Sequence, residues 1–157
     1  YVGLMINDEG APSVVEYNVR FGDPETQVTI PLIESDLGEM LLAAAEGRIA
    51  DYQPTFSNKS AVTVVLASEG YPGPSKTGRE ITGENTRIEE GEIVAFVHQA
   101  GTSRNDEGKL VSSGGRVLSA TAVASELPSA VDAAYAIIEE INLQGSHYRG
   151  DIAYRAL

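Results

Sequence analysis

The sequence contains no cysteine and no tryptophan, and it is poor in positive charge. Without cysteine the chain forms no disulfide and has no thiolate for catalysis or metal binding. Eleven lysine and arginine residues stand against 23 aspartate and glutamate residues, which gives a formal net charge of −12. A chain this acidic repels a phosphate backbone at long range, so we expect no nucleic-acid partner.

Long apolar runs are also missing. The run Ala61–Ala67 is among the longest, and a membrane-spanning helix needs about 20 apolar residues. We therefore expect no membrane partner, and because no signal peptide is visible we expect a cytoplasmic protein. The first residue is Tyr1, inside an apolar and strand-like stretch, so we expect the sequence to be a piece of a longer chain.

Residues 1–50 begin with the pattern of a β-hairpin. The stretches Val2–Asn7 and Ser13–Val19 are apolar and β-prone, and a cluster of turn-forming residues separates them. The Asp-Pro pair that follows predicts a short helix, with Asp23 as its N-cap and Pro24 at its first position.

A second helix is predicted over Asp36–Glu46. Asp36 can cap its N-terminus, Glu39 stands where a capping box requires an acidic residue, and Gly47 ends the helix. Helical spacing predicts one apolar face, formed by Leu37, Leu41 and Ala44.

Beyond this helix the pattern changes to that of a small, mostly antiparallel β domain. Four strands, separated by glycine-rich or polar turns, are predicted over Ala61–Ala67, Glu92–His98, Lys109–Ser112 and Arg116–Ala124. Pro128 then opens a helix whose apolar face is predicted to hold Val131, Ala134, Ile138 and Ile141. We therefore expect an α+β fold in two parts, residues 1–50 and 51–157, with the last helix covering the sheet of the second part.

The end of the second strand carries alternating polar side chains. In the run Glu16-Tyr17-Asn18-Val19-Arg20, alternation places the three polar residues on one side and turns Tyr17 and Val19 toward apolar packing. A carboxylate and an amide oxygen are hard ligands that Mg²⁺ accepts, and an arginine suits a phosphate or acyl phosphate. A polar strand face exposed to water is the alternative, because so short a pattern is common by chance.

The stretch Val15–Gln27, VEYNVRFGDPETQ, resembles very closely the signature of phosphoribosylamine–glycine ligases, which are ATP-grasp enzymes. Four later stretches resemble the same family in the same order, namely Val64–Gly73, His98–Thr102, Gly114–Leu118 and Tyr148–Ile152. The resemblance covers nearly the whole chain. It departs at Tyr17, where family members often carry Phe, and by one extra residue in His98–Thr102.

The resemblance implies an activity and a set of site residues. ATP would phosphorylate the glycine carboxylate, and the amine of 5-phosphoribosylamine would attack the resulting glycyl phosphate. Glu16 and Asn18 would be ligands of Mg²⁺ or Mn²⁺, Arg20 would be catalytic and substrate-binding, and Asp23 and Glu25 would bind substrate. ATP, glycine, 5-phosphoribosylamine and the rest of the ligase chain would be its partners.

The resemblance also implies that residues 1–50 end an ATP-grasp domain whose adenine-binding segments precede Tyr1, so we expect no turnover from these 157 residues alone. Two alternatives stay open: another ATP-grasp ligase with a different acid or amine, and a non-catalytic lid or interaction domain.

Two further features predict no chemistry. The stretch Gly70–Thr77 is similar to a phosphate-binding loop, but its two prolines lack the N–H donors that such a loop needs, so we expect a surface loop with a solvated Lys76. His98 and His147 stand alone in sequence, and we expect neither to bind a metal.

Overall fold

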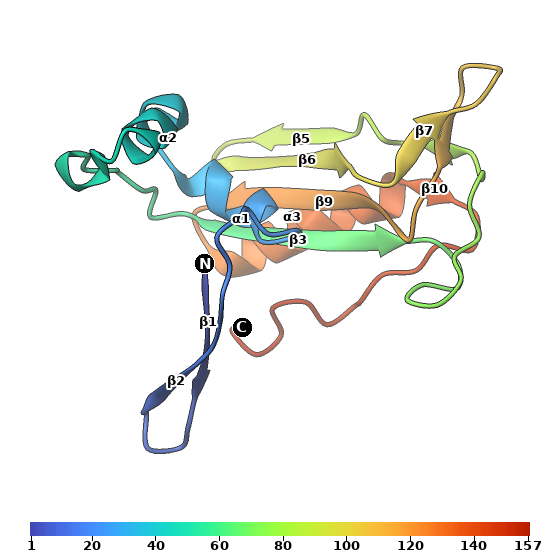
Figure 1. The fold of residues 1–157 in the computed structure, drawn as a ribbon. Coiled ribbons are helices and arrows are strands. Elements are labelled where there is room, and N and C mark those ends of the chain that lie inside the picture. Colours follow the sequence, from blue (N-terminus) through green and yellow to red (C-terminus); the bar gives the residue numbers. More distant parts are fainter.

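The computed structural model describes residues 1–157, which form an α+β fold of mostly antiparallel strands (Figure 1). The strands are β1 (Val2–Ile6), β2 (Pro12–Tyr17), β3 (Ser60–Ala67), β4 (Ile81–Thr82), β5 (Arg87–Glu90), β6 (Ile93–Gln99), β7 (Thr102–Arg104), β8 (Leu110–Ser112), β9 (Arg116–Ala124) and β10 (Asn142–Leu143). The helices are α1 (Thr26–Thr29), α2 (Leu37–Ala45) and α3 (Leu127–Glu140), with 3-10 turns η1 (Ile30–Leu32) and η2 (Ile49–Asp51).

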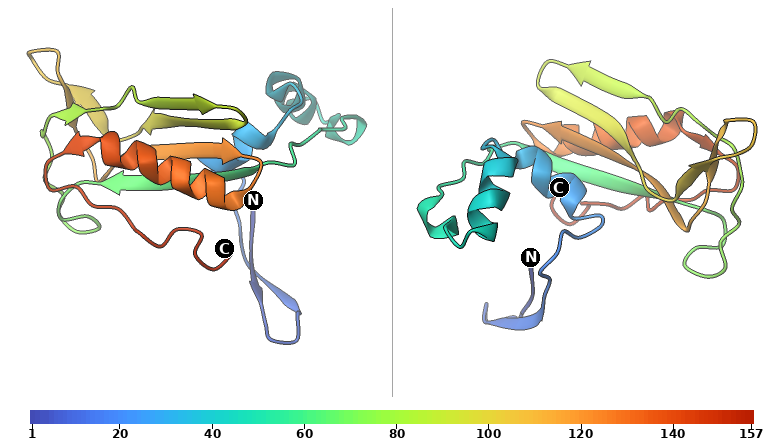
Figure 2. Two further views of the ribbon diagram at one scale, coloured as in Figure 1. Left: turned by 180° about the vertical axis from the view of Figure 1, so that it is seen from behind. Right: turned by 45° about the horizontal axis from the view of Figure 1, so that its top comes forward.

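The main sheet has four antiparallel strands in the order β3-β9-β6-β5. Helix α3 covers one face of it, as the view from behind shows (Figure 2). Apolar side chains on that face meet the buried residues of α3, which are Ala130, Val131, Ala133, Ala134, Ile137 and Ile138. The predicted covering helix and three of its four apolar positions are thus confirmed, and Ile141 becomes the half-buried C-cap.

The opposite face of the sheet is partly covered by α1 and η1, which lie in front of it in Figure 1 and contact β3. This face carries buried hydroxyl groups. Ser119 and Thr121 on β9 are buried, and the Thr63 and Thr121 hydroxyls are 2.8 Å apart, so the two β-strands are also joined through their side chains. A polar layer beneath a short helix distinguishes this face from the apolar face under α3.

All four predicted segments are β-strands, and three of them, β3, β6 and β9, belong to the main sheet. Leu110–Ser112 pairs with β7 in a separate two-stranded sheet, and β5 takes the fourth position of the main sheet. Glu89 and Glu90 belong to β5 and are followed by an exposed turn at Gly91. Edge strand β5 was missed because its charged sequence lacks the apolar alternation of a half-buried strand.

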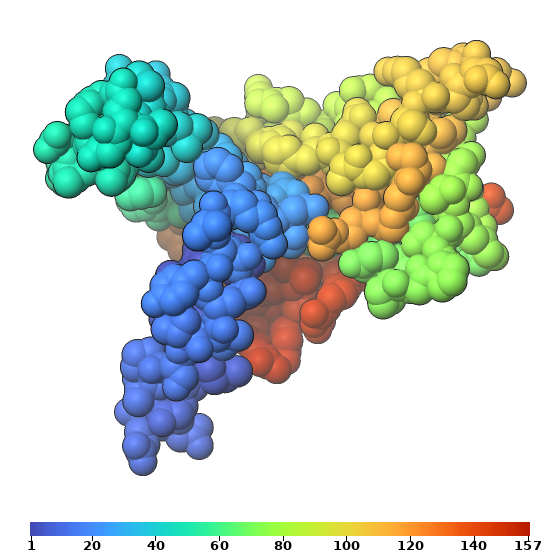
Figure 3. Space-filling model, in the orientation of Figure 1, coloured from blue at the N-terminus to red at the C-terminus, as the bar shows by residue number.

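The β1–β2 hairpin projects away from the rest of the chain (Figure 3). Its apolar side chains are exposed on both faces, and Tyr17 and Val19 are 70% and 99% exposed. The prediction that these two residues pack on apolar neighbours is therefore wrong within this chain. The reason is geometric, because no element of residues 1–157 lies against either face of the hairpin.

The helices of the first part begin and pack differently from the prediction. Helix α1 begins at Thr26 with Glu25 as N-cap and no side-chain capping bond, so Asp23 is not its N-cap. Helix α2 begins as predicted, with the Asp36 carboxylate accepting a hydrogen bond from the Glu39 amide at 3.0 Å. The side chain of Glu39 does not return a bond, so only half of the predicted capping box is present.

Helix α2 ends in a Schellman motif at Gly47, whose φ is +72°. The Gly47 amide donates to the Ala44 carbonyl and the Arg48 amide donates to the Ala43 carbonyl, as this motif requires. Ala43 is the buried residue of the helix, whereas Leu41 is 45% exposed. The predicted face through Leu41 is therefore wrong. The side of the helix that is covered carries Ala43, which lies next to the predicted Ala44 in the sequence.

The longest helix, α3, has 14 residues. No helix of the chain has both the length and the apolar character that crossing a bilayer requires.

Candidate functional site

The signature loop between β2 and α1 is fastened to the main sheet by one aspartate. The Asp23 carboxylate accepts a hydrogen bond from the Arg116 guanidinium at 3.0 Å and another from the Gln27 amide at 2.9 Å. Arg116 is the first residue of β9, so the bond joins the two halves of the chain. The Asp23 carboxylate therefore binds the side chains of Arg116 and Gln27 instead of capping α1, and each of its two oxygen atoms accepts one hydrogen bond.

The predicted metal ligands lie at the base of the hairpin. Glu16 pairs with Gly3, and Asn18 exchanges two backbone hydrogen bonds with Tyr1, of 2.8 and 2.9 Å. A Cβ at Gly3 would lie 3.3 Å from the Glu16 Cγ atom, so the glycine leaves room for this side chain. The Nδ2 atom of Asn18 is buried and has no hydrogen-bond partner.

These residues fit a hard divalent cation as a partial ligand set. A carboxylate and an amide oxygen supply two oxygen ligands, and Mg²⁺ is commonly held by one or two carboxylates together with substrate phosphates. The chain has no cluster of three or more histidine, cysteine, aspartate or glutamate residues able to hold a metal by itself. The remaining ligands would thus be phosphate oxygens and water.

Arg20 lies beside Asn18 rather than beside Asp23. A pocket of about 330 Å³ is lined by Tyr1, Asn18, Val19, Arg20, Phe21 and Leu41. Asn18 and Arg20 therefore share one surface, whereas Asp23 and Glu25 line two other pockets. The structure brings the predicted residues to one loop region but not to one cavity.

The second pocket lies between the signature loop and the end of β6. It measures about 390 Å³ and is lined by Phe21, Gly22, Asp23, Thr26, Gln27, Ile30, Pro31, His98 and Gln99. Burial lowers the pKa of the His98 imidazole below its ordinary value. Its Nε2 atom is buried and has no hydrogen-bond partner.

His98 was not singled out as a site residue from the sequence, and neither was Arg116. His98 follows Phe96 by two positions on β6, and their rings meet edge to face with centroids 4.9 Å apart. A polar side chain at the end of an otherwise apolar strand was the available signal. Its meaning depends on the loop that covers this end of the strand, which spacing along the sequence does not reveal.

Glu25 faces the C-terminal segment. Its flexible carboxylate lies close to Gly22 and would have to move if that residue carried a side chain. A mostly apolar pocket of about 320 Å³ is lined by Pro24, Glu25, Val28, Ala61, Val62, Thr63, Leu127, Ile152, Ala153 and Ala156. The signature loop and the chain end therefore meet over the start of β3.

Tyr135 of α3 holds the C-terminal segment in this position. Its hydroxyl donates to the Arg149 carbonyl at 2.7 Å and accepts from the Ile152 amide at 3.1 Å. The Arg149 guanidinium forms two hydrogen bonds with the Asp151 carboxylate, of 2.9 and 2.7 Å. The fourth of the later family-like stretches, Tyr148–Ile152, is thus held against α3 by hydrogen bonds.

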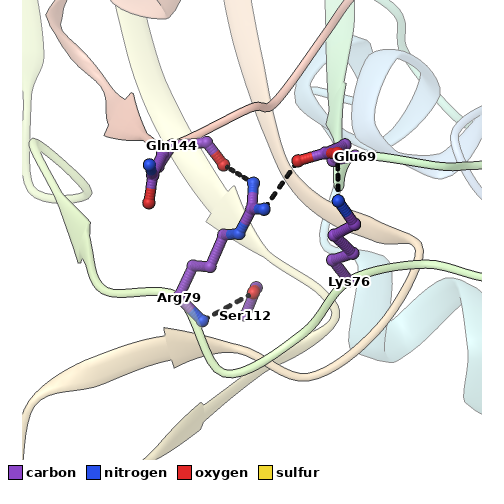
Figure 4. A network of polar contacts seen from close by, with 5 residues as sticks. All are labelled: Glu69, Lys76, Arg79, Ser112 and Gln144. Atoms are coloured by element: carbon purple, nitrogen blue, oxygen red, sulfur yellow. Dashed lines mark hydrogen bonds and ion pairs between the residues drawn. The ribbon is translucent and has the colours of Figure 1, made fainter.

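A charged network orders the loop after β3 (Figure 4). The Glu69 carboxylate pairs with Lys76 at 2.5 Å and with Arg79 at 2.6 Å, and Arg79 also donates to the Gln144 carbonyl. Hydrogen bonds from Lys76 and Arg79 hold the pKa of Glu69 below its usual range. Lys76 is mostly exposed but forms an ion pair with Glu69. The stretch is therefore a surface loop that is held in place by ion pairs.

Three family-like stretches touch one another at the same end of the sheet. Ser68 donates a hydrogen bond from its hydroxyl to the Gly114 carbonyl at 2.8 Å. A Cβ at Gly101 would lie 2.6 Å from the Arg116 carbonyl oxygen, and one at Gly115 would lie 2.5 Å from the Tyr71 ring. Only glycine permits these approaches, and they place Arg116 where it can reach Asp23.

Comparisons with known proteins agree with this arrangement of motifs. Residues 61–155 match the family model of the phosphoribosylglycinamide synthetase C domain. A phosphoribosylamine–glycine ligase of Caulobacter vibrioides is 48% identical over 158 aligned residues, which cover 100% of this chain and 36% of that protein. One from Chlorobaculum tepidum is 49% identical and is likewise covered to 36%.

A crystal structure of the phosphoribosylamine–glycine ligase of Thermotoga maritima has the same fold. It superposes with a TM-score of 0.71 and 37% sequence identity over 96% of this chain and 35% of that one. The chain thus spans about a third of the length of the relatives it matches. On the match of the C-domain model to residues 61–155, the chain belongs to the phosphoribosylglycinamide synthetase family.

Proposed function

We propose that this chain is the C-terminal part of an ATP-dependent ligase that joins glycine to 5-phosphoribosylamine in purine synthesis. The observation that carries the proposal is the name shared by relatives that align along the whole chain at 48–49% identity. Residues 1–50 would end an ATP-grasp domain and residues 51–157 would form the C domain. We place the ligase in the cytoplasm, as the resemblance implies.

The proposed reaction has two steps. The γ-phosphoryl group of ATP moves to the glycine carboxylate, which gives glycyl phosphate and ADP. The amine of 5-phosphoribosylamine then attacks the activated carbonyl, so that a C–N bond forms, the C–O bond to phosphate breaks and the amine loses a proton. The products are glycinamide ribonucleotide and inorganic phosphate.

In this scheme Glu16 and Asn18 hold Mg²⁺ or Mn²⁺ through their side-chain oxygens. A bound cation of this kind neutralises charge on the transferring phosphoryl group. Arg20, which lines one pocket with Asn18, supplies a fixed positive charge for a phosphate or acyl phosphate oxygen. Asp23 and Glu25 orient substrate from the loop that begins beside Arg20, and the bonds from Arg116 and Gln27 keep Asp23 in place.

The test is substrate-dependent ADP formation by the complete ligase. ADP should form only when glycine and 5-phosphoribosylamine are both present, and glycinamide ribonucleotide should accumulate in equal amount. Turnover with another carboxylic acid or amine but not with these two would favour a different ATP-grasp ligase. Residues 1–157 alone should give no turnover, because the adenine-binding segments are expected before Tyr1.

A further inference from the structure

The pocket between the signature loop and the end of β6 contains a histidine that the proposed reaction does not yet use. We propose that this pocket binds the ribosyl and amine end of the sugar-amine substrate, with His98 Nε2 and the Asp23 carboxylate as hydrogen-bond partners. The inference rests on the proposed function and assigns one substrate of that reaction to a place.

The position of His98 is fixed by the sheet. It lies on β6 directly opposite Ser119 of β9, and its ring packs edge to face on Phe96. A side chain on a central strand keeps its place better than one on a loop, which suits a group that must meet a small substrate. The signature loop and the start of η1 form the other wall, so the pocket joins the two halves of the chain.

The Nε2 atom of His98 is the group that requires a partner. It is buried and forms no hydrogen bond within the chain. Buried polar atoms are nearly always paired, because an unpaired one has lost its hydrogen bond to water without replacement. Burial also lowers the pKa of this imidazole, which favours the neutral ring, and a neutral imidazole can exchange a hydrogen bond with a hydroxyl or an amine.

The charges of the lining determine which end of the substrate fits. Asp23 is the single charged side chain among the lining residues, and its partner Arg116 is not one of them. The lining offers no cation to a phosphate, whereas the carboxylate oxygens of Asp23 can accept hydrogen bonds from an amine or hydroxyl donor. Each Asp23 oxygen already accepts one hydrogen bond and can accept a second, while Gln27 and Gln99 add amide groups for hydroxyl recognition.

The size of the pocket separates the two small substrates. Its volume of about 390 Å³ lies in the range of small-molecule sites, roughly 300–1,000 Å³. Glycine would occupy a small part of it, whereas a pentose with an amine at its anomeric carbon would reach both walls. The phosphate of the sugar would then point out of the pocket, away from the carboxylate.

The decisive experiment compares His98→Phe with the wild type in the complete ligase. Phenylalanine keeps the ring and its contact with Phe96 but removes Nε2. We expect KM for 5-phosphoribosylamine to rise about threefold to tenfold, the loss typical of one neutral hydrogen bond, with KM for glycine and ATP unchanged. His98→Gln, which returns an amide near the lost nitrogen, should recover part of that loss, and His147→Phe should change nothing.

Binding gives a second readout that does not depend on turnover. Glycosylamines hydrolyse in water, so the stable product glycinamide ribonucleotide is the probe for calorimetry. His98→Phe and Asp23→Asn should each weaken its binding, while ribose-free glycinamide should bind neither the variants nor the wild type measurably.

The outcomes separate this inference from the proposed function. A wild-type ligase with normal turnover whose His98 variants keep the KM for the sugar amine overturns the inference alone, and so does a rise in the KM for glycine instead. Melting curves of all variants identify any loss of folding. If His98→Phe fails to fold, the KM of His98→Gln for the sugar amine tests the inference. A wild-type protein without ligase turnover overturns both proposals together.

Discussion

The Asp23 carboxylate and the Arg116 guanidinium form a 3.0 Å ion pair between residues that are 93 positions apart in the sequence. One belongs to the signature loop and the other begins β9, at the end of the sheet where three family-like loops meet. The pair therefore sets the position of the loop relative to the sheet.

Arg116→Met should affect substrate binding more than folding. The pair is about half exposed, with side-chain exposures of 41% and 48%, so its removal should change the free energy of unfolding by no more than about 1 kcal/mol. In the complete ligase the freed Asp23 should raise KM for the sugar amine by more than about threefold. Lys109→Met is the matched control, since its pair with Glu80 has exposures of 50% and 51% and lies away from the loop. Equal kinetics for the two variants would mean that the ion pair does not position Asp23.

Glu16→Gln and Asn18→Leu should each reduce turnover of the complete ligase by more than about tenfold, equivalent to about 1.4 kcal/mol of barrier. The first removes the ligand charge and the second removes the ligand oxygen, while side-chain size is nearly kept. Excess Mg²⁺ should partly restore Glu16→Gln, because a weakened site refills by mass action. Glu9→Gln, at the exposed turn of the same hairpin, serves as the control. Near-normal turnover of both variants at limiting Mg²⁺ would contradict the metal-ligand assignment and favour the alternative, a polar strand face exposed to water.

Tyr17→Ala should behave differently in the short and the long chain. Tyr17 is 70% exposed in residues 1–157, so its loss should leave the melting temperature of this chain unchanged. In the complete ligase we expect the ring to be covered, and its truncation should then cost about 3–5 kcal/mol, as for other large aromatic side chains. The measurement is thermal melting of both lengths with and without the substitution. Equal shifts in the two lengths would contradict a covered hairpin.

Glu69→Gln should lower stability in a pH-dependent way. Hydrogen bonds from Lys76 and Arg79 depress the pKa of Glu69 in the folded state, so the unfolded chain binds the proton more readily. The stabilisation is therefore fully present above the unfolded pKa, about 4.3, and disappears as the pH falls through the lower folded value. Melting temperatures of the two proteins should differ at pH 7, and the difference should shrink as the pH falls below about 4.3. A difference that does not change over this range would point to packing instead of charge.

Gly101→Ala should destabilise the chain by about 1–3 kcal/mol, the usual cost of an added group in a tight contact. A Cβ at this position would lie 2.6 Å from the Arg116 carbonyl oxygen, so backbone has to move. Gly150→Ala is the control, because nothing lies within 4 Å of the Cβ it would add and its backbone is not left-handed. Chemical denaturation of both variants measures the difference, and similar midpoints would contradict the close approach.

The sequence predicted the elements that depend on local pattern. The Asp36 cap, the Gly47 stop and the buried face of α3 through Val131, Ala134 and Ile138 follow from chemistry within a few neighbouring residues. The surroundings of Tyr17 and Leu41 were predicted wrongly, because alternation identifies a face but not what lies against it.

The sequence predicts candidate site residues but not how they are arranged in space. Glu16, Asn18 and Asp23 came from the signature, whereas the neighbourhood of Asp23 and His98 depends on a loop from one half of the chain lying on a strand of the other. No spacing within the sequence carries that information.

Strands β3 and β6 end, and β9 begins, at the end of the sheet where the motif loops gather. The opposite end holds the exposed β5–β6 turn at Gly91, whose positive φ of 57° marks a tight reversal of the chain. A fluorophore or surface tether introduced at this turn would sit a full strand length from the loops. The fold thus provides an attachment point from which distances to the motif loops can be followed by energy transfer without altering those loops.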